Sequence, residues 1–285
     1  MFTSLLSLRS LLLAAGLSAI AFSQDSKPAE VNNPVATKPN PEAAAAALKK
    51  AAAAANVKEA RESEIVVSLA VGAGINQARG AITIAADGSR TSIRVKADND
   101  AIDKIDAKSI FDGKDLWIQD RGMTMKGTVE EIELLMRLNP QLAMFLGAPA
   151  RVIAGYQKWY QFDRVENIEK DGKKYVAVSG NMMKEKRKLI VQKFTRDLCS
   201  TAKLYFNQSD SSLAGVELLN KSGAMSSGYF YTEWKKLEKA GDSLFSYIPP
   251  LGANIITPQD LMNQSIGNAV AEPDDDTPAS KPAEK

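Results

Sequence analysis

Hydrophobic side chains between residues 63 and 257 recur in short runs, rich in β-branched and aromatic residues, that are separated by turn-forming residues. Asp-Gly pairs at 87–88, 112–113 and 171–172 lie between such runs and are strong hairpin signals. Roughly ten strands predict one strongly curved antiparallel sheet, because sheets of that size tend to curl. The expected strands are 64–71, 80–86, 91–97, 108–111, 116–119, 159–165, 175–178 and 188–194, followed by a closing meander within 203–256 that ends in a strand from Phe245.

Two stretches predict helices instead. Residues 42–62 are rich in alanine, which has the highest helix propensity. The apolar face of this helix is thin, so it either lies closely across a sheet or stands in solvent. A capping-box pattern at Thr128–Glu131 predicts a second helix through Leu138, which Asn139–Pro140 ends.

The first 23 residues have the layout of a secretory signal peptide. Arg9 precedes an apolar run over 11–22, and small residues lie just before Gln24. A membrane anchor is the alternative, but this run is shorter than the roughly 20 residues that span a bilayer. We therefore expect export to the periplasm with cleavage near Gln24. No cysteine stands at this point, so the chain is not expected to carry a lipid anchor of its own.

Composition divides the remainder of the chain. Residues 24–41 are rich in Pro, Asn, Lys and Ala and predict a flexible tether. Residues 258–285 lose the hydrophobic pattern and become acidic and Pro-rich, which predicts a disordered tail. The predicted order is signal peptide (1–23), tether (24–41), helix (42–62), β domain (63–257) and tail (258–285).

Charge offers little indication of a partner. Without residues 1–23 the chain has 35 basic and 34 acidic side chains, so no overall field attracts nucleic acid, and we expect no nucleic-acid partner. The basic run Lys184–Lys188 is a local exception. It is either a solvated turn beside a strand or a contact for an acidic partner.

The chain has no histidine, which removes the usual general base and the commonest metal ligand. The single cysteine, Cys199, excludes intramolecular disulfides and has no histidine to activate it, so we expect an inert thiol. The glycines at 72, 74 and 80 lack the lysine and hydroxyl residue that end a phosphate loop. We therefore expect no enzyme, no metal and no cofactor.

Several motifs along the β domain appear in the order found in one known family. They are Gly80–Ile84 with Ser92–Val95, the hairpin Ser109–Asp120 (SIFDGKDLWIQD), Trp159–Phe162 with Asp171–Val178, and the ending Phe245–Ile256 with its Pro-Pro-Leu-Gly exit. Together these motifs resemble the outer-membrane lipoprotein carrier (LolA) family over residues 63–257. The resemblance implies a half-open antiparallel β-barrel, mainly β with helices, whose apolar concave face is covered by a lid of short helices.

The function implied by the resemblance is a periplasmic carrier that shields the acyl chains of a lipoprotein, or a free lipid, on the way to the outer membrane. Each buried methylene contributes about 0.8 kcal/mol, so an apolar cavity binds such cargo without polar contacts. The implied partners are this lipid cargo and transport proteins of the inner and outer membranes, and the carrier is expected to be a monomer. An envelope sensor or protein-interaction module is the alternative, because sensor domains related in fold bind polypeptides and because the tether and tail suit such a role.

The expected cavity and lid residues follow from the same resemblance. Four methionines, at 123, 125, 136 and 144, gather near the implied lid, where they either adapt to a flexible ligand or fill the core. Arg94 is the implied latch between lid and barrel, with Arg79 and Arg90 as alternatives. The expected lipid-binding residues are Trp117, Ile118, Met125, Leu135, Met136, Phe145, Phe245 and Tyr247.

Overall fold

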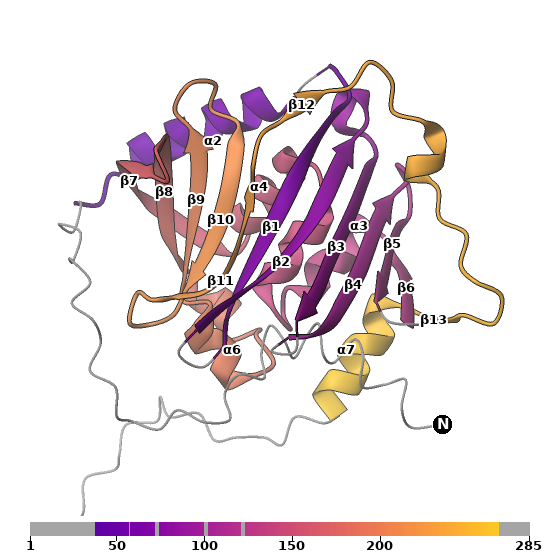
Figure 1. The fold of residues 1–285 in the computed structure, drawn as a ribbon. Helices are drawn as coiled ribbons and strands as arrows, with labels where there is room; N and C mark the ends of the chain where they lie inside the picture. The colour runs from indigo at the N-terminus through magenta and orange to yellow at the C-terminus, as the bar shows by residue number, and fades with distance from the viewer. Residues whose placement is uncertain (1–37, 57, 72–73, 100–101, 121–122, 268–285) are drawn as a thin grey trace, which may run out of the picture.

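The computed structural model describes residues 38–56, 58–71, 74–99, 102–120 and 123–267. Within these ranges thirteen strands form one sheet (Figure 1). The strands are β1 (Arg61–Val71), β2 (Gly74–Ile84), β3 (Thr91–Asn99), β4 (Ile102–Phe111), β5 (Leu116–Asp120), β6 (Met123–Gly127), β7 (Tyr160–Lys170), β8 (Lys173–Met182), β9 (Thr201–Asn207), β10 (Leu213–Leu219), β11 (Met225–Tyr231), β12 (Lys235–Lys236) and β13 (Asn254–Ile256). The helices are α2 (Pro41–Ala55), α3 (Val129–Leu135), α4 (Pro149–Gln157), α5 (Lys184–Arg187), α6 (Lys193–Leu198) and α7 (Pro258–Gly267), with 3₁₀ segments η1 (Ala86–Gly88), η2 (Pro140–Leu146) and η3 (Asp242–Phe245).

The sheet is open and mostly antiparallel. Its strand order is β13-β6-β5-β4-β3-β2-β1-β11-β10-β9-β8-β7, with β12 paired to the start of β1. The two halves join where β1 pairs with β11, from Ile65 opposite Tyr231 to Leu69 opposite Ser227. Because β7 and β13 stay at the two edges, the sheet does not close on itself. The predicted single, curved antiparallel sheet with a helical part is confirmed.

The Asp-Gly pairs make the predicted turns. Asp171 and Gly172 both have positive φ, 52° and 72°, which suits a tight two-residue hairpin between β7 and β8. At the turn between β4 and β5, the Asp112 carboxylate accepts hydrogen bonds from the backbone N–H groups of Lys114 and Asp115, at 2.9 and 2.8 Å. These turns are local, so a short sequence is enough to specify them.

Helices cover one face of the sheet, which we call the concave face. Figure 1 looks onto the opposite face, so that α2, α3 and α4 lie behind the strands. The alanine-rich α2 packs on β7, β8 and α4 with Ala44, Leu48 and Ala51 buried. Small side chains allow this close approach, so the helix lies across the sheet. It ends at Ala55, earlier than predicted, and β1 already begins at Arg61.

A hydrophobic core fills the space between the concave face and the helices. Alternate residues of each strand point into it, for example Ile65, Val67 and Leu69 of β1, because strand side chains alternate between faces. A smaller cluster lies outside this core and contains Tyr175, Ala177, Tyr205 and Ala214.

Two predicted strands are wrong. Residues 188–194 do not form a strand, because Ile190 continues the turn after α5 by donating its N–H to the Arg187 carbonyl, and α6 begins at Lys193. The strand predicted from Phe245 into the Pro-Pro-Leu-Gly exit does not form, because η3 ends at Phe245 and the chain joins the sheet only after the exit, where β13 pairs with β6 in the parallel direction. Pro249 and Pro250 have no N–H to donate, which keeps the segment before β13 out of the ladder.

The prediction of disorder from residue 258 is wrong for the first ten residues of that range, which form α7. Thr257 and Asp260 cap this helix reciprocally, since the Thr257 hydroxyl accepts from the Asp260 N–H and the Asp260 carboxylate accepts from the Thr257 N–H. Leu261 and Met262 join the core. The predicted signal peptide, most of the tether and residues 268–285 lie outside the described residues.

Candidate functional site

The concave face gathers five of the eight residues predicted to bind lipid. Ile118 of β5 and Met125 of β6 lie opposite each other in the ladder and are 3% and 1% exposed. Leu135, Met136 and Phe145 come from the helical layer above and belong to the same core cluster. The structure therefore brings sheet and lid residues together, and lipid binding by this cluster stays a prediction.

The η2 segment packs beneath α3 and α4 and contributes Leu142 to Leu146 to the core cluster. All seven of its residues, Pro140 to Leu146, are buried. The Asn139 side chain caps its start by accepting from the Gln141 N–H at 2.9 Å, and Gly147, with φ of 76°, ends it. Three pockets in the described part of the chain are polar and are lined by none of the eight predicted residues. The buried η2 therefore lies among the residues that were expected to surround an acyl chain.

Trp117, Phe245 and Tyr247 do not belong to the concave cluster, so the structure does not bring all eight predicted residues together. Trp117 neighbours Ile118 on β5 and therefore points to the other face. Tyr247 stacks on it, with ring centroids 5.3 Å apart, and shares a hydrogen bond of 3.2 Å with the Thr124 hydroxyl. Phe245 is buried outside the core, under the Arg90 guanidinium.

Arg94 is not placed to hold the lid. Its side chain is 59% exposed and lies between the inward-facing Ile93 and Val95, which puts it on the face that the helices leave uncovered. Its nearest acidic partner is Asp106, with Nε 3.8 Å from the carboxylate. Neither alternative arginine connects the helices to the sheet, since Arg79 pairs with Glu64 and Arg90 pairs with Asp242.

Arg151 of α4 makes the connection that was predicted for Arg94. Its Nε donates to the Leu146 carbonyl at the end of η2, at 2.9 Å, and its Nη1 donates to the Gly88 carbonyl at 3.1 Å. The guanidinium also lies 4.5 Å from the centre of the Phe111 ring on β4. Partial burial lowers the pKa of Arg151 from its usual value. One side chain therefore ties α4 and η2 to the sheet and to the β2–β3 connection.

A sequence signal for Arg151 exists, although the motif comparison missed it. It is the only charged residue within residues 140–157, a stretch of 18 residues. Charged side chains are seldom placed in such a segment without a specific partner. A lone cation in an apolar lid segment is therefore a better latch candidate than an arginine on an exposed strand.

Buried aromatic residues form the wall between α4 and the centre of the sheet. Tyr156 and Tyr160 of α4 and β7 have ring centroids 5.9 Å apart, and Tyr229 and Tyr231 of β11 are 5.8 Å apart. Burial raises the pKa of all four hydroxyls. Burial also raises the pKa of the Cys199 thiol to about 12, which fits the expected inert cysteine.

The described residues contain no group of three or more His, Cys, Asp or Glu side chains that could hold a metal ion. None of the helices that the structure describes has the length and apolar character needed to span a membrane.

Comparisons with known proteins add structural neighbours at low sequence identity. No family model matches the chain, and no curated protein matches its sequence. An uncharacterised conserved protein from Thermus thermophilus is 8% identical, with a TM-score of 0.47, and the match covers 76% of this chain and 99% of that one.

Two other neighbours have names that indicate a partner or a family. The Pseudomonas aeruginosa MucA/MucB complex contains a chain that is 15% identical, with a TM-score of 0.41, over 72% of this chain and 61% of that one. A LolA superfamily protein from Nitrosomonas europaea is also 15% identical, with a TM-score of 0.34, over 72% and 97% of the two chains. Identities this low, with these TM-scores, carry no assignment of function to this chain.

Proposed function

We propose that this protein is a periplasmic carrier that shelters the acyl chains of a lipoprotein, or of a free lipid, between its sheet and its helical layer. The observation that carries the proposal is the apolar cluster shared by the concave face and the helical layer, in which Ile118 and Met125 of the sheet lie with Leu135, Met136 and Phe145 of the helices. The seven-residue η2 is buried, contributes Leu142 to Leu146 to this cluster and takes no part in the strand ladder. An acyl chain that replaced it would exchange one apolar occupant for another.

The energetics favour such an exchange. About ten buried methylenes contribute roughly 8 kcal/mol, which is enough to offset a partial opening of the lid. Met136 and Met144 of the helical layer and Met125 of the sheet border this region, and unbranched thioether side chains adapt to ligands of different shape. The closed structure then corresponds to the unloaded carrier.

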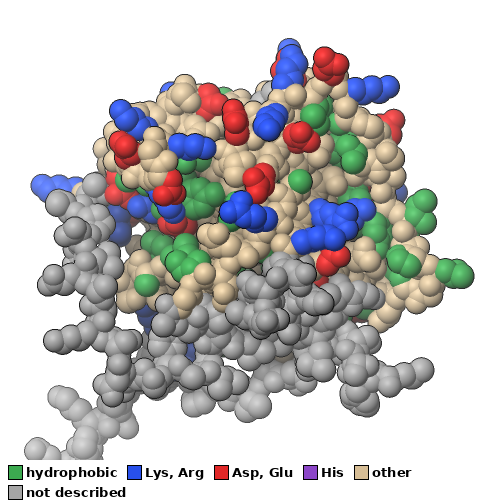
Figure 2. Space-filling view, in the orientation of Figure 1, with side chains coloured by type: hydrophobic (Ala, Val, Ile, Leu, Met, Phe, Trp, Pro, Cys, Tyr) green, Lys and Arg blue, Asp and Glu red, His purple; other side chains and the backbone are tan. Residues whose placement is uncertain are grey.

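An exposed apolar loop supports a contact with other envelope components. Ile248 and Leu251, between η3 and β13, are 88% and 107% exposed, and Ile255 is 47% exposed. Hydrophobic side chains protrude at the margin of Figure 2 where Figure 1 draws this segment. Under the proposal, this loop is the contact for the transport proteins that load or unload the carrier.

The test is uptake of a fluorescent acyl probe by delipidated protein, measured as a saturable rise in emission for probes of several chain lengths. Arg151→Met should take up the probe faster than the natural protein, because it loosens the lid. Arg94→Met is the matched control, since it removes an arginine from the exposed face, and it should behave like the natural protein. Absence of saturable uptake by both the natural protein and Arg151→Met, at every chain length, would refute the carrier.

A protein-binding module is the second candidate, and the filled interior is the observation that favours it. Under this alternative a polypeptide partner binds residues 271–285 together with the exposed loop at Ile248 and Leu251, while the lid stays shut. Pull-down from envelope extract with chains that contain or lack residues 271–285 separates the two roles. A module loses partners with the tail and takes up no probe, whereas a carrier takes up the probe with or without it.

A further inference from the structure

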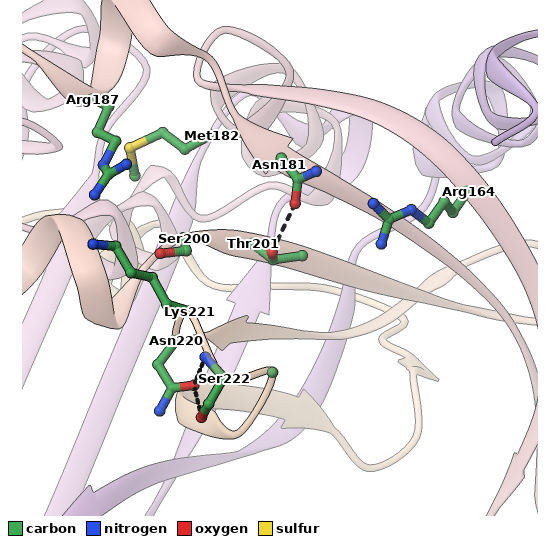
Figure 3. A pocket seen from close by; sticks show the side chains of 10 residues that line it. Arg164, Asn181, Met182, Arg187, Ser200, Thr201, Asn220, Lys221 and Ser222 are labelled. Carbon is green, nitrogen blue, oxygen red and sulfur yellow. Dashed lines mark hydrogen bonds between the residues drawn. The ribbon is translucent and has the colours of Figure 1, made fainter. Parts of the chain in front are cut away.

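An open pocket of about 490 Å³ lies at the ends of β8 and β9, beside α5 and the turn between β10 and β11 (Figure 3). None of the predicted lipid-binding residues lines it. Three cationic side chains do, namely Arg164, Arg187 and Lys221. Figure 3 shows Arg187 and Lys221 together on one side of the pocket and Arg164 on the other.

The first two cations are held in place by one carboxylate. Asp197 accepts from Arg187 Nη2 at 3.0 Å and from Lys221 Nζ at 2.9 Å. Each cation keeps further N–H groups beyond this single contact, since a guanidinium has five and an ammonium has three. Arg164 has only a looser pairing, with Nε 3.6 Å from the Asp163 carboxylate. The pocket therefore has oriented positive groups with spare donors.

The neutral residues of the pocket also present donors. The Asn220 side-chain oxygen accepts from the Ser222 N–H at 2.9 Å, the Ser222 hydroxyl at 2.7 Å and the Ala224 N–H at 3.0 Å. The Asn181 side-chain oxygen accepts from the Thr201 hydroxyl at 3.0 Å. These bonds occupy the amide oxygens and fix the orientation of both amides, so that the two NH₂ groups remain as the groups available to a ligand.

The charge around the pocket also favours an anionic ligand. Residues 184–197 contain six basic and two acidic side chains, and Arg187 belongs to the basic run of the sequence. That run forms the short exposed helix α5, and its Arg187 lines the pocket. A local excess of positive charge raises the concentration of anions near the pocket.

We propose that this pocket binds a phosphate ester. A phosphate group has several acceptor oxygens pointing in different directions, so it can accept from Arg187 and Lys221 together and from a further donor of the pocket, whereas a planar carboxylate offers only two oxygens. The phosphate can belong to a lipid headgroup or to a soluble ester. This inference does not rest on the carrier function, because the pocket is lined by none of the residues predicted to bind lipid.

The experiment measures binding of glycerol 3-phosphate by isothermal titration calorimetry, and of phosphatidylglycerol vesicles by co-sedimentation, with phosphatidylcholine vesicles for comparison. Binding of glycerol 3-phosphate identifies a site for soluble esters. Binding confined to phosphatidylglycerol vesicles identifies a lipid headgroup site. In either case Arg187→Gln and Lys221→Gln should weaken binding about tenfold or more.

Two further variants keep the result interpretable. Arg79→Gln removes an exposed arginine that does not line the pocket and should leave binding unchanged. Asp197→Asn removes the carboxylate that competes for two of the cations, so phosphate should bind more tightly, an effect that misfolding cannot produce. The proposal is overturned if neither probe binds, or if Arg187→Gln, Lys221→Gln and Arg79→Gln all bind equally well. Uptake of the acyl probe, measured on the same variants, reports separately on the concave face.

Discussion

Replacement of Arg151 by methionine should loosen the helical layer selectively. The change removes the hydrogen bonds to the Leu146 and Gly88 carbonyls and the contact with the Phe111 ring. Methionine preserves much of the apolar stem of the side chain, so packing of α4 is largely retained. The variant therefore tests the polar connection between lid and sheet.

The size of the effect follows from these contacts. A hydrogen bond to a charged group contributes about 1.5 to 3 kcal/mol, and a cation–π contact about 0.5 to 2 kcal/mol. The contributions are not additive, and the two carbonyls regain some contact with water. We expect a net loss of about 2 to 4 kcal/mol. If this loss falls on local opening of the lid, the open population rises roughly 30- to 700-fold.

Hydrogen exchange measured by mass spectrometry reads this opening segment by segment. Amides of η2 and α4 should exchange faster in Arg151→Met, while amides of β1 to β3 should stay protected. Arg94→Met is the control, because an exposed surface substitution usually changes stability by less than about 0.5 kcal/mol. Guanidinium unfolding of both variants gives the global change for comparison.

Three results would show that the reasoning is wrong. Exchange in η2 and α4 could be the same in Arg151→Met and in the natural protein, which would mean that Arg151 is not a latch. Arg94→Met could accelerate exchange equally, which would mean that the effect is not specific. Exchange could also rise uniformly over sheet and helices, which would mean that the lid opens only when the whole domain unfolds.

Other predictions concern stability and titration. Gly147→Ala should lower the free energy of unfolding in urea by several kcal/mol, because the new Cβ would clash with the Thr91 side chain at a φ of 76°. Gly172→Ala has a similar φ but nothing within 4 Å of the new Cβ, so it should lower the free energy of unfolding by only about 1 to 2 kcal/mol. The free energy of unfolding should fall as the pH rises above about 9 to 10, because burial raises the pKa of Cys199 and of tyrosines such as Tyr156 in the folded state. Above that pH the unfolded chain releases protons that the folded chain retains. A free energy of unfolding that does not change with pH up to about pH 11 would contradict this. Iodoacetamide should modify Cys199 only after unfolding, and rapid modification of the native protein at about pH 8 would show that the thiol is accessible.

The sequence predicts what is decided locally. The hairpin at Asp171–Gly172 and the capping box at Thr128 depend on a few adjacent residues, and the structure contains both. The pairing of β1 with β11 depends on burial of residues that are far apart in the chain, such as Ile65 and Tyr231. A single sequence does not contain the packing that selects this register.

The assignment of site residues shows a different limit. Trp117 and Ile118 are adjacent on a strand, so they could not both line one face, and the alternation of side chains already implied this. The family resemblance selected apolar residues by position in a motif without regard to the face. Arg151 was missed for the opposite reason, because no motif contains it, although its isolation within an apolar segment indicates a specific partner.

Under the proposed carrier function, the burial of η2 bears on how cargo is released. An empty cavity would bind a long acyl chain with the full contribution of every buried methylene, and dissociation would be slow. When the chain's own η2 competes for the same surface, its return offsets part of the free energy lost as the cargo leaves. The net affinity is then a difference between two apolar occupants. Transfer in either direction therefore requires only a small bias, which contact of a partner with the exposed Ile248–Leu251 loop could supply.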